Sequence, residues 1–186
     1  EHPTLSFCLA PHAPYTVSDN TLSNIFTFAN QLDLPIHMHL HETCEEIASS
    51  IDDFGIRPIE RLQKLNLLGP NLIAVHMVHL TNEEINLLKV HNCNVIHCPS
   101  SNMKLASGIA PIVDLVNQSI NVAIGTDGAA SNNRLDMFEE MRLTALLGKV
   151  TRGAQALPTH QILQMATLNG AIALGIEKQT GSLTVG

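Results

Sequence analysis

Short apolar runs alternate along the chain with longer stretches in which apolar residues recur every three or four positions. This alternation is typical of a parallel sheet whose strands are connected by helices. The apolar runs predict five strands, at residues 5–10, 35–41, 72–80, 94–97 and 122–126. No glycine-rich phosphate-binding turn follows any of them, so the α/β pattern favours part of a TIM-like (β/α)8 barrel over a doubly wound sheet.

The stretches between these runs carry helix signals. Ser18 is placed to cap a helix, and Thr81 with Glu84 has the spacing of a capping box. Pro99 is expected to end the fourth strand. Further helices are predicted at residues 44–50, 58–65, 111–118, 136–147 and 159–174. No change in composition marks a domain boundary, so residues 1–186 are expected to form one domain. A complete barrel takes about 250 residues, so an incomplete barrel is predicted.

Composition and charge restrict the classes of partner. The chain has 17 acidic and 10 basic residues, a net charge of -7, and no basic run that could follow a phosphate backbone, so nucleic acid is not an expected partner. No apolar stretch approaches the roughly 20 residues that span a bilayer. We therefore expect a cytoplasmic protein with no membrane contact. The four cysteines lack C-x-x-C spacing and are expected to be reduced thiols.

Imidazole and carboxylate groups gather where the predicted strands end. The chain has ten histidines, as many as all its lysines and arginines together. The strand-end groups are His12, His39 with His41, His76, His97 and Asp127. In (β/α)8 barrels the reactive side chains lie at the carboxyl ends of the strands. Each buried polar group needs a partner, so packing alone does not explain five such ends. A shared site is predicted there.

Side-chain alternation restricts which of these histidines can face the site, but it does not assign a direction to each one. His37, His39 and His41 share one face of their strand, and alternation cannot choose among them. His76 and His79 face opposite ways, and we expect His79 to face the helical layer.

The carboxylate of Asp127, taken alone, could cap a helix or form an Asx turn. Beside His39 and His76 it is better explained as a ligand of zinc or another divalent transition metal.

Six stretches of the sequence resemble the amidohydrolase superfamily, and specifically its methylthioadenosine/S-adenosylhomocysteine deaminases. They are residues 10–15, 37–43, 75–80, 97–105, 125–133 and 135–142. The resemblance implies that one divalent ion, Zn²⁺ with Fe, Mn or Ni as alternatives, is held by His39 and Asp127. It also implies that His12 and Glu42 contact the substrate, that His76 lies beside the attacking water, and that the loop at residues 104–108 is near the mouth of the site.

The reaction implied by the resemblance is hydrolytic deamination of 5'-methylthioadenosine or S-adenosylhomocysteine by a metal-activated water. Asp127 would relay the water proton to the leaving amine, Glu42 would protonate a ring nitrogen, and His76 would stabilise the developing charge. Another amidohydrolase activity, such as guanine deaminase or triazine hydrolase, is an alternative. A metal-free truncated scaffold without activity is an alternative of another class. Family members commonly form homo-oligomers, so self-association is also expected.

One departure from the family pattern is large. The family's first barrel strand carries a His-x-His pair that supplies two metal ligands, and no segment before His12 provides it. The chain is therefore expected to be the C-terminal part of the barrel, starting near the fourth strand, with the first strands and a small β-domain missing.

Overall fold

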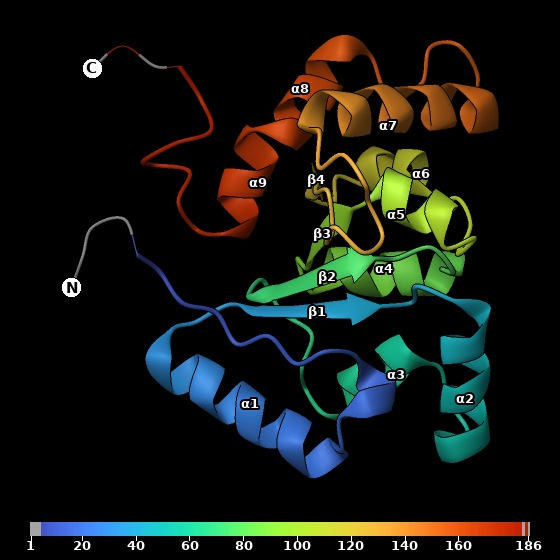
Figure 1. The fold of residues 1–186 in the computed structure, drawn as a ribbon. Helices are drawn as coiled ribbons and strands as arrows, with labels where there is room; N and C mark the ends of the chain where they lie inside the picture. Colours follow the sequence, from blue (N-terminus) through green and yellow to red (C-terminus); the bar gives the residue numbers. More distant parts are fainter. Residues whose placement is uncertain (1–4, 184, 186) are drawn as a thin grey trace.

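A four-stranded parallel sheet forms the centre of the computed structural model, which describes residues 5–183 and 185. The strands run in the order β1-β2-β3-β4, and each pairs in parallel with the next (Figure 1). Their bounds are β1 (Ile36–Leu40), β2 (Leu72–His76), β3 (Asn94–His97) and β4 (Val122–Ile124). The predicted α/β class is confirmed, and all carboxyl ends lie at the same edge of the sheet.

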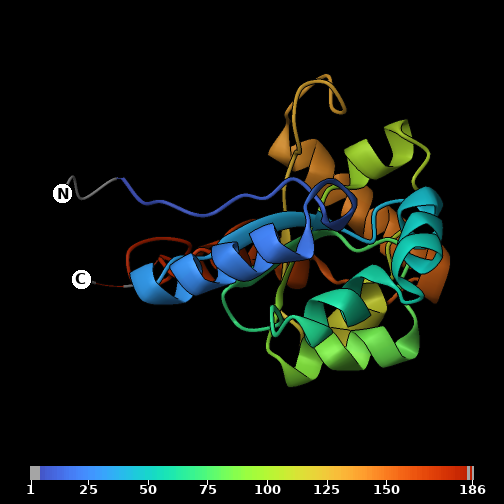
Figure 2. The same cartoon turned by 90° about the horizontal axis from the view of Figure 1, so that it is seen from below.

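Helices lie beside both outer strands of the sheet, β1 and β4. In Figure 1, α1 to α3 lie on the side of β1 and α7 to α9 on the side of β4, and Figure 2 shows α1 alongside β1 from below. The helices are η1 (Pro14–Thr16), α1 (Asp19–Leu32), α2 (Cys44–Phe54), α3 (Pro58–Lys64), α4 (Asn82–Val90), α5 (Pro99–Lys104), α6 (Ile112–Asn117), α7 (Met137–Arg152), α8 (Thr159–Ala166) and α9 (Leu168–Ala173).

Local hydrogen bonds explain where several helices begin. The Ser18 hydroxyl accepts a bond from the backbone N–H of Thr21 and so caps α1. Thr81 and Glu84 form the predicted capping box of α4, each side chain bonded to the backbone N–H of the other. Both caps satisfy N–H groups that the first turn of a helix leaves without partners.

The first predicted strand, at residues 5–10, is wrong. Only Leu9 bridges to Ile36, although the segment continues along the edge of β1, where the N–H of His39 donates to the carbonyl of His12. Pro11 has no N–H to donate, which limits regular pairing of this segment. The segment still holds His12 beside β1.

Several further boundaries differ from the sequence predictions, and three of them have a cause in the local backbone. The strand predicted to reach residue 80 ends at His76, because His76 and Met77 have φ angles of 79° and 49°. Pro99 begins helix α5 as well as ending a strand, since proline suits the first helical position. The helix predicted at 159–174 divides into α8 and α9 at Thr167, whose ψ of -89° is not helical.

The main core lies between one face of the sheet and the helices. Ile36, Met38 and Leu40 of β1 are buried in it, whereas His37 and His39 on the opposite face are half-buried. Within the described part of the chain, no helix is long and apolar enough to cross a membrane. All four cysteines are free thiols, as predicted.

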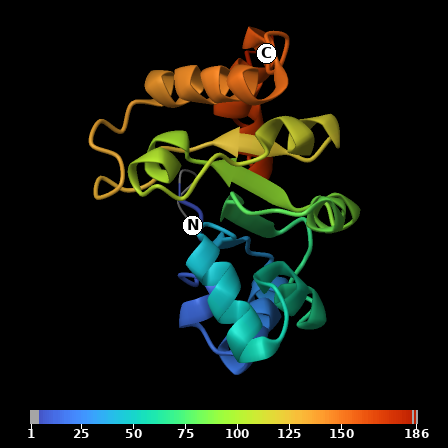
Figure 3. The same cartoon turned by 90° about the vertical axis from the view of Figure 1, so that its right-hand side faces the viewer.

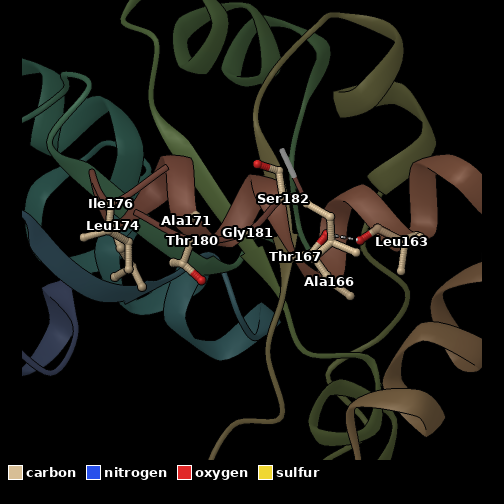
Figure 4. Close-up of a pocket in the computed structure, with 10 residues that line it drawn as sticks. Leu163, Ala166, Thr167, Ala171, Leu174, Ile176, Thr180, Gly181 and Ser182 are labelled. Atoms are coloured by element: carbon tan, nitrogen blue, oxygen red, sulfur yellow. Dashed lines mark hydrogen bonds between the residues drawn. The ribbon is translucent and has the colours of Figure 1, made fainter. Parts of the chain in front are cut away.

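A hollow of about 750 Å³ lies between α8, α9 and residues 180–183 (Figure 4). Leucine, isoleucine and alanine side chains form most of its wall, and none of the strand-end histidines or carboxylates lines it. The groups suited to proton transfer therefore lie elsewhere, at the carboxyl ends of the strands.

Candidate active site

Five predicted site residues come together at the carboxyl ends of the strands. The rings of His12 and His39 have centroids 5.1 Å apart, and those of His39 and His76 are stacked at 5.4 Å. The Nε2 atom of His76 lies 3.7 Å from Oε2 of Glu42 and 3.9 Å from Oδ2 of Asp127. Figure 3 shows the fold from the side towards which β1 and β2 point in Figure 1, so their carboxyl ends face the viewer. Three imidazoles and two carboxylates thus form one polar group of residues.

A left-handed backbone brings His76 into this group. Leu72 and Ala74 of β2 pack in the core, so simple alternation would place His76 on the core face as well. Its φ of 79° rotates the Cβ atom relative to the preceding peptide, and the ring stacks on His39 instead. Such φ angles are uncommon outside glycine, and histidine and aspartate are among the residues that adopt them most readily.

His41 is displaced from the site by the same kind of rotation. It was expected to share the face of His37 and His39, but its φ is 55° and its side chain is fully buried. Its Nδ1 donates to the carbonyl of His79, and its Nε2 accepts from the N–H of Ile59. Both nitrogens are used, and burial lowers the pKa of the imidazole. His41 is therefore a neutral structural residue, and the expectation that it shares one face with His37 and His39 is wrong.

His39 is held through one ring nitrogen, and its other nitrogen makes no hydrogen bond to the described residues. Its Nδ1 donates to the carbonyl of His12 over 2.7 Å, and because a carbonyl oxygen only accepts, this bond fixes the hydrogen on Nδ1. Nε2 then carries the lone pair, as in metal-ligating histidines whose other nitrogen is bonded to a backbone carbonyl. The segment before η1 thus orients His39 through its backbone, and His12 itself bonds Thr16 through Nδ1.

Asp127 is held as a carboxylate. Its φ is 59°, and its Oδ2 accepts bonds from the hydroxyls of Ser101 and Ser131 at 2.6 and 2.8 Å. Oδ1 accepts from the N–H of Gly128. Burial alone would raise the pKa of this group, but these hydrogen bonds outweigh burial, so its pKa is lowered.

Glu42 projects from a bend that a second carboxylate stabilises. Glu46, in the first turn of α2, accepts bonds from the N–H groups of His41 and Glu42, at 2.9 and 2.7 Å. Burial raises the pKa of Glu46, although the backbone hydrogen bonds act in the opposite direction. Glu46 therefore fixes the turn after β1 and leaves the Glu42 side chain directed at His76.

Two other histidines do not join the facing groups. His97 is 2% exposed, and burial lowers its pKa to about 3, so it is neutral. Its Nδ1 has no hydrogen-bond partner among the described residues. The ring of His79 bonds the carbonyl of Ser107, which agrees with the expectation that His79 does not point into the site.

The predicted metal ligands fit a divalent ion by donor type. His39 offers a free imidazole nitrogen and Asp127 a charged carboxylate, the donors that zinc accepts. Across residues 5–183 and 185, however, no group of three or more His, Cys, Asp or Glu side chains is arranged to hold a metal ion. The described residues thus supply part of a ligand set.

Several positioning residues were not predicted from the sequence. Asn102 bonds His76, while Ser101 and Ser131 bond Asp127. Helix α5, which carries two of them, had no amphipathic pattern that could have revealed it, and Pro99 at its start was the one available signal. The predicted loop at residues 104–108 begins at Lys104, the last residue of α5, which bonds the carbonyl of Ala130 in the loop after β4.

The chain is similar to known deaminases along its length. The chain is 52% identical over 186 residues to a 5-methylthioadenosine/S-adenosylhomocysteine deaminase of Teredinibacter turnerae, covering 100% of the chain and 42% of the relative. It is 46% identical over 177 residues to a 5'-deoxyadenosine deaminase of Methanobrevibacter smithii, covering 95% and 41%. A zinc-bound adenosine deaminase structure from Xanthomonas campestris matches with a TM-score of 0.98 and 50% identity, covering 100% and 43%.

The chain spans about two fifths of the length of these relatives. The matches do not support the narrower prediction that it is the C-terminal part of a barrel, and the expected loss of the first strands and a small β-domain stays a prediction. The family itself is established, because the amidohydrolase profile matches residues 4–186. The chain belongs to the amidohydrolase family.

Proposed function

We propose that the protein containing this chain hydrolytically deaminates adenine nucleosides with a modified 5' position, such as 5'-methylthioadenosine and S-adenosylhomocysteine. The observation that carries the proposal is the placement of Nε2 of His76, 3.7 Å from Glu42 and 3.9 Å from Asp127. Two carboxylates beside one imidazole can divide the roles of proton acceptor and proton donor. The names of the relatives at 46–52% identity support the same substrate class.

The proposed reaction converts the nucleoside and water into the inosine analogue and ammonia. Asp127, whose lowered pKa keeps it ionised, accepts one water proton and delivers it to the leaving amine. Glu42 protonates a purine ring nitrogen and recovers the remaining water proton when the carbonyl forms. His76 lies beside the attacking water, and its Nε2 accepts a hydrogen bond from that water and so stabilises the charge that develops on it. A divalent metal, Zn²⁺ in our proposal, would lower the pKa of the water from 15.7 towards about 7.

His39 and Asp127 would hold this metal, and His12 with Glu42 would contact the substrate. We further propose that the four strands are one arc of a (β/α)8 barrel and that the remaining metal ligands come from the part of the protein outside this chain. Cytoplasmic location and self-association stay predictions.

Ammonia release by the intact protein tests the proposed activity. The substrates are 5'-methylthioadenosine, S-adenosylhomocysteine and 5'-deoxyadenosine, with guanine and an aminotriazine as alternatives. We expect the highest kcat/KM for one of the three adenine nucleosides. Preference for guanine or the triazine would replace the proposed substrate class with the alternative amidohydrolase activity.

Metal content distinguishes the enzyme from the metal-free scaffold. Elemental analysis of the intact protein should give at least one divalent ion per chain. Removing it with a chelator should abolish ammonia release, and adding zinc back should restore it. Sub-stoichiometric metal in the purified 186-residue chain would favour the truncated scaffold for that chain.

A further inference from the structure

Two consecutive residues of one short helix hold two groups of the proposed site. Ser101 of α5 donates its hydroxyl hydrogen to Oδ2 of Asp127 over 2.6 Å. Asn102, the next residue, bonds Nδ1 of His76 through its side-chain oxygen over 2.8 Å. Both side chains are at most 1% exposed. Helix α5 therefore connects the end of β2 with the end of β4, although it follows β3 in the chain.

The bond from His76 to Asn102 determines which imidazole nitrogen is free. An amide oxygen accepts hydrogen bonds and cannot donate, so Nδ1 of His76 must carry the hydrogen. In the neutral ring the lone pair is then on Nε2, the atom that faces Glu42 and Asp127. The opposite tautomer would place a lone pair against the lone pairs of Asn102 and lose this bond.

Only one end of the Asn102 amide takes part in such bonding. Within residues 5–183 and 185, its Nδ2 atom is buried without a hydrogen-bond partner. An unsatisfied buried donor costs about 1–3 kcal/mol. Asn102 therefore contributes to the site through its oxygen and not through its Nδ2. Substitutions that keep or remove the oxygen acceptor can test this role.

We propose that Asn102 is a positioning residue that fixes His76 as the Nδ1–H tautomer, so that Nε2 is presented to the space between Glu42 and Asp127. The proposal rests on the proposed function for its catalytic meaning, since it names what orients His76 in that reaction. Ser101 acts beside it by orienting the Asp127 carboxylate. Through these two residues, α5 sets the relative placement of the imidazole and the carboxylate.

The tautomer is measured directly by long-range ¹H–¹⁵N correlation spectra of the histidine rings in the intact protein. We expect His76 to show a protonated Nδ1 and an unprotonated Nε2. A spectrum showing Nε2–H in the unsubstituted protein would overturn the proposal. This measurement does not depend on the folding of any variant. The spectrum also needs no substrate, so it separates failure of this proposal from failure of the deaminase proposal.

A pair of substitutions separates the oxygen from the rest of the side chain. Asn102→Asp keeps an acceptor for Nδ1, whereas Asn102→Leu has similar volume and no acceptor. We expect Asn102→Asp to retain the Nδ1–H tautomer. Asn102→Leu should give a mixture of tautomers and lower kcat by about 10- to 100-fold. KM should change less than about 3-fold, because only the presentation of Nε2 as an acceptor is lost.

Asn94→Leu is the matched control, because Asn94 is also a buried asparagine that begins the neighbouring strand β3, at the opposite end of the sheet. It should leave the His76 tautomer and kcat unchanged. An unchanged tautomer and kcat in Asn102→Leu would overturn the proposal. An equal loss of the tautomer in Asn102→Asp and Asn102→Leu would do the same, because it would show that the acceptor oxygen is not the cause.

Discussion

The two ends of the central sheet both carry buried polar groups, but they use them differently. At the amino end, asparagine side chains bond backbone carbonyls and one another. Asn94 donates to the carbonyl of Pro70 and Asn121 donates to Asn94, over 2.8 and 2.7 Å. Asn169 of α9 donates to the carbonyl of Val122 over 2.8 Å. These neutral amides satisfy backbone groups and connect neighbouring elements.

At the carboxyl end, titratable groups face one another without closing a direct bond. His76 lies 3.7 and 3.9 Å from two carboxylates, and both His76 and Asp127 have left-handed φ angles. Such conformations cost about 1–3 kcal/mol each and persist only where the surrounding structure requires them. One end of the sheet is therefore built for stability, and the other holds groups that remain free to react. Substitutions at the two ends should therefore change different measurements.

The largest effect is expected from Asp127→Asn at the carboxyl end. Asparagine tolerates the left-handed φ and can still accept hydrogen bonds from the two serines, so the fold should be retained. The lost negative charge should lower kcat roughly 10⁴-fold, which is at the upper end of effects for general acid–base residues. It should also reduce the amount of bound metal. Turnover and elemental analysis measure both. Undiminished turnover with full metal content would remove Asp127 from the mechanism.

Glu42→Gln should have the next largest effect. The amide cannot act as a proton donor of the required strength, so kcat should fall roughly 10²- to 10³-fold. Metal content should stay unchanged, because Glu42 is not a proposed ligand. Glu45→Gln is the matched control, since Glu45 is exposed on α2 and contacts no site residue in the described bonds. Equal losses in the two variants would contradict a specific role for Glu42.

Acid should destabilise the carboxyl end through His97. The folded-state pKa of about 3 lies below the ordinary value of 6.5, so the unfolded chain binds the proton more readily. The stabilising contribution is present above pH 6.5 and is lost as pH falls from 6.5 towards 3. Between pH 7 and pH 5, this one group should reduce the free energy of unfolding by about 2 kcal/mol.

Urea unfolding at pH 7 and pH 5 measures this loss, and His97→Asn should diminish it. His41 also has a lowered pKa, so a smaller acid dependence should remain in that variant. An identical loss in the two proteins would mean that His97 is protonated in the folded state.

The smallest effect on turnover is expected at the amino end. Asn94→Leu leaves the Pro70 carbonyl without its side-chain donor and removes an acceptor from Asn121. The free energy of unfolding should fall by about 1–3 kcal/mol, with kcat and KM unchanged. Chemical denaturation and steady-state kinetics measure the two quantities. A loss of kcat comparable to that of Glu42→Gln would erase the distinction between the two ends.

Local sequence patterns correctly predicted the α/β class, four of the five expected strands, the caps at Ser18 and Thr81, and the placement of histidines and Asp127 at strand ends. These features follow from local periodicity and from short-range hydrogen bonds. Both depend only on residues that are close together in the sequence. The family resemblance rested on the same strand-end motifs.

Tertiary structure decided which imidazoles reach the site. Alternation predicts side-chain direction only while the backbone stays extended, and left-handed φ angles at His41 and His76 reverse it at both strand ends. The hydrogen bond between His76 and Asn102 joins residues that are 26 positions apart in the sequence. No local pattern encodes such a contact, because it exists only once β2, β3 and α5 have packed together.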